Sequence, residues 1–134
     1  MENKSNESTP QRPEGNRIID APLVNLDLNE YKSQIKNEKP WSENDRNAIT
    51  LFKSNGLRLV LIALHKDAEM AKHSAKGIIT VQVQQGLIRF STEEQSVELS
   101  AGQMIVLHEG IPHSVVAIEE STFLLTLIET SLSK

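Results

Sequence analysis

From Asn47 onward the chain consists of short runs rich in Val, Ile, Leu and Thr, separated by Gly, Pro, Ser and Glu residues. The runs follow one another at intervals of about ten residues, with no long helical pattern among them. This spacing is typical of an all-β fold, either a closed barrel or a jelly roll. The predicted strands are 47–53, 57–65, 78–84, 86–91, 95–99, 104–107, 113–118 and 122–129.

The chain before this part divides into a tail and an extension. Residues 1–16 are polar, contain Pro10, Pro13 and Gly15, and have no aliphatic residue after Met1. Such a segment cannot bury enough apolar surface to offset the entropy lost on ordering. We therefore predict a disordered tail over 1–16, an N-terminal extension over 17–46 and a barrel domain over 47–134.

The extension contains a helix signal. Asp27 is a candidate N-cap, and Glu30 three residues later completes the pattern of a capping box. Leu28, Tyr31 and Ile35 then recur at helical spacing, which predicts a short amphipathic helix that ends before Pro40.

The run from Leu59 to Leu64 is apolar on both faces, as expected of a strand that is covered on both sides. The second cover is expected to come either from the N-terminal segment or from another subunit. Trp41, the only Trp of the chain, is interpreted as an anchor between the helix and the barrel.

Composition excludes several classes of partner. The net charge is −4, and Lys and Arg form no stripe, so a nucleic acid is not an expected partner. No run approaches the roughly 18 apolar residues of a membrane span, and the expectation is a cytoplasmic protein with no membrane partner. The chain has no Cys, so a metal would need His, carboxylate or water ligands.

All four histidines, His65, His73, His108 and His113, lie in the strand-rich part. The segment around them resembles the two sequence motifs of the cupin superfamily, and the resemblance spans about fifty residues with every spacing kept. The first motif corresponds to Asp67, His73-Ser74-Ala75, Ile79 and Gly86. The second corresponds to Gly102, His108-Glu109-Gly110, Pro112, His113 and Ala117.

This resemblance implies a cupin-like double-stranded β-helix, a jelly-roll barrel with a central pocket, often dimeric. It also implies a metal site formed by three histidines and a glutamate. Of these four ligands only His73 and His113 remain, because Ala75 and Ile79 occupy the other two positions. Neither side chain can donate a lone pair to a metal.

Strand alternation leads to the same pocket. Ile79 and Val81 lie on one face of their strand, and the pocket wall is apolar if this face points inward. Together with the positions that the resemblance implies, the predicted ligand pocket is lined by His73, Ala75, Ile79, Val81 and His113. Even catalytic zinc sites use three protein ligands, so iron, manganese, nickel or zinc would need a third ligand beside His73 and His113. The candidates are Glu69, His65 and His108.

The sequence thus favours a protein that binds or senses a small molecule, with no catalytic residue assigned, and the resemblance implies a homodimer. Ser74 and Ser114 follow histidines directly and point to the opposite face, which argues against a serine hydrolase. Two alternatives stay open: a metal-dependent isomerase or dioxygenase with Glu69 as a ligand, and a purely structural dimerisation barrel. Arg46 or Arg58 is a candidate to meet an anionic ligand.

Overall fold

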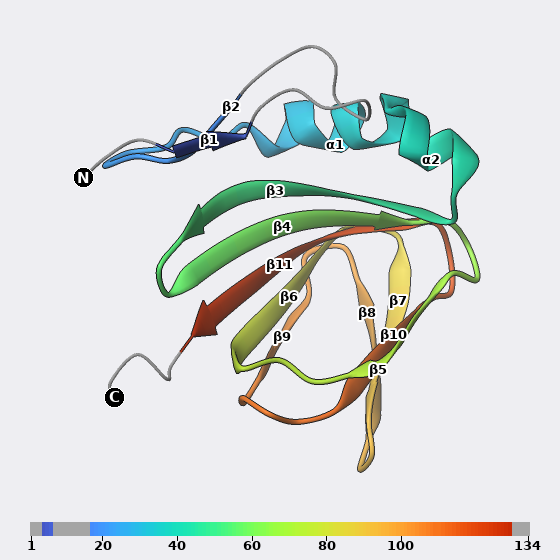
Figure 1. Cartoon of the computed structure of the whole chain (residues 1–134). Coiled ribbons are helices and arrows are strands. Elements are labelled where there is room, and N and C mark those ends of the chain that lie inside the picture. Colours follow the sequence, from blue (N-terminus) through green and yellow to red (C-terminus); the bar gives the residue numbers. More distant parts are fainter. Residues whose placement is uncertain (1–3, 7–16, 130–134) are drawn as a thin grey trace.

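The computed structural model describes residues 4–6 and 17–129 (Figure 1). The helices are α1 (Leu28–Asn37) and α2 (Lys39–Glu43). The strands are β1 (Lys4–Asn6), β2 (Arg17–Asp20), β3 (Arg46–Ser54), β4 (Leu57–Leu64), β5 (Glu69–His73), β6 (Gly77–Gln85), β7 (Leu87–Thr92), β8 (Ser96–Ser100), β9 (Met104–Leu107), β10 (His113–Ala117) and β11 (Ser121–Glu129).

Two antiparallel sheets form the barrel. One has the strand order β3-β4-β11-β6-β9 and the other has the order β5-β10-β7-β8, while β1 and β2 pair separately. The inner faces of both sheets contribute to one hydrophobic core, in which Ile62 and Val81 of the first sheet meet Phe90 and Val115 of the second. The predicted all-β jelly-roll barrel is confirmed.

Alternation along each strand decides which side chains enter this core. In β6, Ile79, Val81 and Val83 are buried and the residues between them are less so. Side chains of successive strand residues point to opposite faces, so these three residues face the interior of the barrel as the sequence predicts.

A second, smaller core lies on the outer face of the five-stranded sheet. It joins Ile35 of α1 to Ile49, Leu51, Leu61 and Ala63 of β3 and β4. Figure 1 shows α1 and α2 lying across these two strands. The N-terminal segment therefore covers the strand that is apolar on both faces.

The helix begins as its sequence indicates. The Asp27 side chain accepts hydrogen bonds from the backbone N–H groups of Asn29 and Glu30, at 3.0 and 3.4 Å. The short helix α2 was not predicted, because Pro40 was interpreted only as a stop signal. Proline also fits the first turn of a helix, because backbone N–H groups there have no acceptor within the helix and the lack of one costs nothing. Pro40 lies in the first turn of α2.

Two further differences concern strands. The strand β5 is missing from the predicted set, because four of its five residues are exposed and none of them is β-branched. In the predicted tail, Lys4–Asn6 pairs with β2 as a short strand, and the remainder of residues 1–16 lies outside the described residues.

Within the described ranges, no helix is long and apolar enough to cross a membrane.

Candidate functional site

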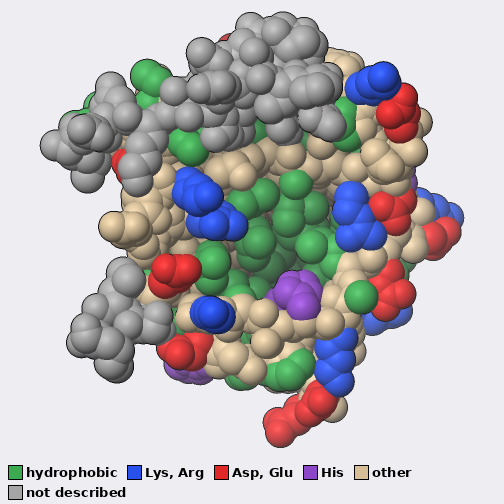
Figure 2. All heavy atoms as spheres, viewed as in Figure 1, with side chains coloured by type: hydrophobic (Ala, Val, Ile, Leu, Met, Phe, Trp, Pro, Cys, Tyr) green, Lys and Arg blue, Asp and Glu red, His purple; other side chains and the backbone are tan. Residues whose placement is uncertain are grey.

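A cavity of about 80 Å³ lies between the two sheets. All five residues of the predicted pocket line it, namely His73, Ala75, Ile79, Val81 and His113. The five-stranded sheet adds Ile62, Phe123, Leu125 and Leu127, and the other sheet adds Met70, Phe90 and Val115. Figure 2 shows a hollow with a hydrophobic interior, a histidine at its edge and basic side chains around it.

Neighbouring strands add residues to this wall that no sequence motif marks. Phe123, Leu125 and Leu127 alternate on β11, and their Cα partners on β6 are Val83, Val81 and Ile79. Residues directly opposite each other in a sheet point to the same side. The alternation was visible in the sequence, but the register between β11 and β6 was not.

The two histidines lie side by side on neighbouring strands. His73 of β5 and His113 of β10 are Cα partners, and their ring centroids are 4.4 Å apart. The ring of Phe90 stacks on His113 at 5.4 Å with an interplanar angle of 13°. The pair thus forms one polar edge of an otherwise apolar cavity.

The backbone fixes the same tautomer in both rings. Nδ1 of His73 lies 2.8 Å from the carbonyl oxygen of Ala71, and Nδ1 of His113 lies 2.9 Å from that of Ile111. A carbonyl oxygen only accepts, so Nδ1 carries the proton and donates it. In the neutral rings each Nε2 is therefore left with a lone pair, available to a hydrogen-bond donor.

The two rings differ in their exposure. His113 is buried and His73 is exposed, so His113 lies at the inner part of the cavity and His73 at its opening. Burial lowers the pKa of His113 below its ordinary value, and the hydrogen bond to Ile111 opposes this shift. His113 is consequently a neutral acceptor at pH 7.

None of the three candidates for a third metal ligand joins the pair. Nε2 of His65 lies 2.8 Å from the carbonyl oxygen of Trp41, and the two rings stack at 3.5 Å, which fastens α2 to the barrel. His108 is exposed in the turn between β9 and β10. Among the described residues no group of three His, Cys, Asp or Glu side chains is placed to hold a metal ion.

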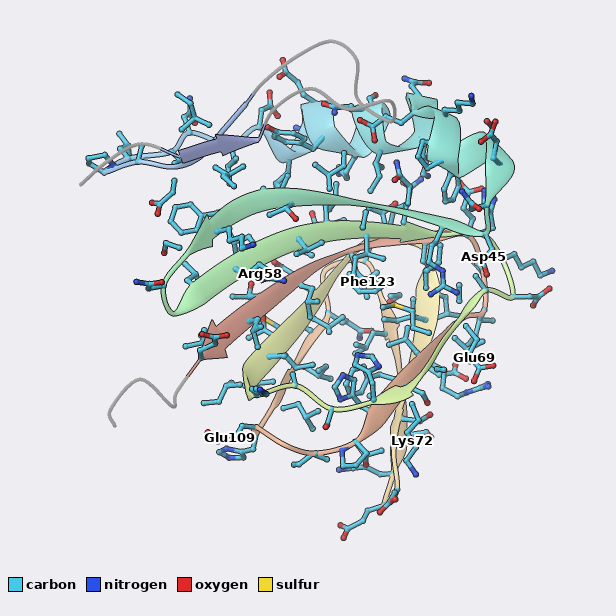
Figure 3. All side chains as sticks on the ribbon, viewed as in Figure 1. Asp45, Arg58, Glu69, Lys72, Glu109 and Phe123 are labelled. Atoms are coloured by element: carbon cyan, nitrogen blue, oxygen red, sulfur yellow. The ribbon has the colours of Figure 1, made fainter. Side chains whose placement is uncertain are left out.

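Glu69 precedes His73 by four residues, a spacing that places both side chains on one face of a regular strand. The pairing of β5 with β10 shifts register, so that His73 lies opposite His113 but Met70 lies opposite Val115. Such a β-bulge inserts one residue and reverses the facing beyond it. Met70 therefore lines the cavity in place of Glu69, which Figure 3 shows on the outer side of the barrel.

These residues do not fit the metal centre that the fold family implies. Ala75 and Ile79 line the cavity at the positions of the two replaced ligands. Two imidazole nitrogens alone fall short of the three protein ligands found in catalytic zinc sites. The arrangement is suited instead to hydrogen bonding with an organic ligand.

The two candidate arginines have different surroundings. Arg46 donates to the Glu69 carbonyl oxygen at 2.7 Å and pairs with Asp45, and the guanidinium lowers the pKa of the Asp45 carboxyl. Arg58 is exposed on β4, opposite Leu127 of the cavity wall. Arg46 thus holds β5 in place, whereas Arg58 lies beside the cavity.

The barrel part of the chain matches a known protein family. The family model of the AraC-like ligand binding domain matches residues 58–133, which is more than half of the chain. The chain belongs to this family. It is a cupin-type domain, and the predicted membership of the cupin superfamily is confirmed. None of the curated proteins compared with the chain matches it.

Solved structures of the same fold come from several bacteria. A conserved protein of unknown function from Streptococcus pyogenes is 26% identical, with a TM-score of 0.64, over 84% of this chain and 92% of that chain. A cupin-2 domain protein from Shewanella frigidimarina is 18% identical, with a TM-score of 0.63, over 78% and 94%. The salicylate 1,2-dioxygenase of Pseudoaminobacter salicylatoxidans is 15% identical, with a TM-score of 0.70, over 82% of this chain and 34% of that chain.

Proposed function

We propose that this AraC-like domain binds a small molecule whose apolar part occupies the cavity between the sheets and whose polar donor meets Nε2 of His73 or His113. The observation that carries the proposal is the combination of an apolar wall with two histidines of fixed tautomer. An apolar pocket with a few convergent polar groups is the usual form of a small-molecule site.

The size of the cavity limits the part of the ligand that enters. A water molecule takes about 30 Å³ in the liquid, and an engineered cavity of about 150 Å³ binds benzene. A volume of about 80 Å³ therefore suits a short alkyl segment better than an aromatic ring. The rest of the ligand lies at the opening beside His73.

The test is a titration with 1-hexanol, in which binding is measured from the NMR chemical shifts of the methyl groups of Val81 and Leu125. We expect saturable shifts in the wild type and their loss in Ala75→Leu, which adds three carbons to the cavity wall. Ala101→Leu, at an exposed turn, is the matched control and keeps binding. Absence of saturable shifts in the wild type, or binding that Ala75→Leu leaves intact, would refute the proposal.

The metal-dependent enzyme remains the rival function, with His73 and His113 as ligands. We expect less than about a tenth of an equivalent of iron, manganese, nickel or zinc in untagged protein, because no third ligand lies beside the pair among the residues that the structure describes. Elemental mass spectrometry checks this. Near-stoichiometric metal that disappears in the His73→Ala/His113→Ala variant would establish the rival instead.

We further propose a cytoplasmic homodimer, in which a second copy covers the part of the five-stranded sheet that α1 leaves open. On the outer face there, Met104 and Val106 of β9 are 48% and 66% exposed and Ile128 of β11 is 40% exposed. Val106→Lys is expected to shift the mass measured by light scattering from dimer to monomer. A monomeric wild type would contradict this contact.

A further inference from the structure

Resting on the proposed function, we infer that the ligand is a hydroxyalkyl carboxylate, whose hydroxyl group donates to Nε2 of His73 or His113 and whose carboxylate is held by Arg58 at the rim of the cavity. One row of paired residues crosses the five-stranded sheet from β3 to β6. Cα partners connect Lys53 to Arg58, Arg58 to Leu127, and Leu127 to Ile79. Residues paired in this way point to the same face of the sheet.

This row changes from basic to apolar where the cavity begins. Leu127 and Ile79 line the cavity, and Arg58 comes next on the same face. Leu127 also lines a neighbouring hollow of about 210 Å³, to which Lys53, Arg58 and Glu129 contribute. The apolar cavity and the basic hollow therefore lie next to each other, on either side of Leu127, and Figure 3 places Arg58 on the interior side of β4.

The charge at this rim is unbalanced. Lys53 and Arg58 face one carboxylate, that of Glu129, and among the described residues neither basic side chain has an ion pair within 4.0 Å. Two other arginines, Arg46 and Arg89, differ, since Arg46 is paired with Asp45 and Arg89 with Glu98. A net positive rim attracts an anion, and the planar fork of a guanidinium matches a carboxylate.

Length also agrees with this class of ligand. The cavity takes only a short alkyl segment, so a longer chain has to leave it through the opening. A chain that leaves past Leu127 reaches Arg58 directly, because the two residues are Cα partners. A hydroxyalkyl carboxylate thus satisfies the apolar wall, the histidine acceptors and the basic rim together.

The test compares hexanoate with 1-hexanol, which share the alkyl chain and differ in charge. We expect hexanoate to bind the wild type about five- to tenfold more tightly, as a charge-assisted hydrogen bond at a partly exposed site allows. Arg58→Gln should abolish this preference and leave 1-hexanol binding unchanged, while Arg58→Lys should restore part of it. Added salt should reduce the preference.

Arg89→Gln supplies the matched control, because it removes the same charge from the outer face of β7. Equal affinity for hexanoate and 1-hexanol in the wild type, or a preference that Arg58→Gln keeps, would overturn the inference and leave the proposed function standing. If neither compound binds, the proposed function itself fails.

Discussion

At the scale of single residues, backbone conformation explains two glycines of the cupin-like motifs. Gly86, between β6 and β7, has φ of +98°, and a Cβ there would collide with the Glu120 carbonyl oxygen and with Ser121. Gly102 has φ of +88°, but a Cβ there would meet nothing within 4 Å. A side chain at Gly102 would therefore meet backbone strain alone, whereas a side chain at Gly86 would meet both backbone strain and steric collision.

We predict that Gly102→Ala lowers the free energy of unfolding by about 1 to 2 kcal/mol, the cost of positive φ for a residue with a side chain. Gly86→Ala should cost about 2 to 3 kcal/mol more, because overpacking adds to that strain. Urea denaturation of both variants measures the difference. Equal losses would show that the chain at Ser121 moves aside freely.

The buried histidine gives a prediction for pH. Burial lowers the pKa of His113 below its ordinary value of 6.5, so the unfolded chain takes up a proton before the folded one does. The stabilisation from neutral His113 is complete above pH 6.5 and is lost as the pH falls through the lower pKa of the folded state. Wild-type protein should therefore lose more stability below pH 6.5 than His113→Gln does, in parallel urea titrations. Identical pH profiles would show that burial does not disfavour the charged ring.

At the scale of elements, a buried amide joins α1 to the sheet. Nδ2 of Asn47 donates to the carbonyl oxygen of Ile35 and to a carboxylate oxygen of Glu38, both at 2.9 Å. Oδ1 accepts from the backbone N–H of Ala48 at 2.9 Å. One side chain of β3 thus completes the C-terminal end of the helix.

We predict that Asn47→Ala destabilises the protein by about 2 to 4 kcal/mol, since it leaves buried polar groups without partners. Ser42→Ala, which removes an exposed hydrogen bond to the Lys39 carbonyl oxygen, is the control and should cost less than about 1 kcal/mol. Hydrogen exchange should accelerate selectively in α1 of Asn47→Ala. Unchanged exchange there would mean that the apolar contacts of Ile35 alone hold the helix.

At the scale of the whole molecule, the cavity is a place where the barrel core is incompletely packed. Phe123 is 1% exposed and forms part of its wall, between the two sheets in Figure 3. Phe123→Ala should lower stability by about 3 to 5 kcal/mol and enlarge the cavity. Calorimetry with and without benzene checks this, because the enlarged cavity should gain thermal stability from benzene and the wild type should not. Stabilisation of both proteins alike would contradict the stated limit on cavity size.

Much of the architecture could be predicted because its signals are local. The period of two in 78–84 placed Ile79 and Val81 inside the barrel, and Asp27 with Glu30 three residues later indicated the start of α1. The resemblance to the cupin motifs implied that His73 and His113 share one pocket, and the two strands that carry them are paired. The strand alternation and the helix start depend on the geometry of a few consecutive residues, so sequence alone determines these two features.

The tertiary structure decided how distant segments meet. The bulge in β5 turned Glu69 outward, the stacking of Trp41 on His65 turned that histidine away from the pocket, and the register of β4 with β11 placed Arg58 beside Leu127. These arrangements join residues far apart in the chain, and they are set by the packing of whole sheets and helices. No local pattern encodes such a register, so the donor set of the cavity and its basic rim emerged only from the folded chain.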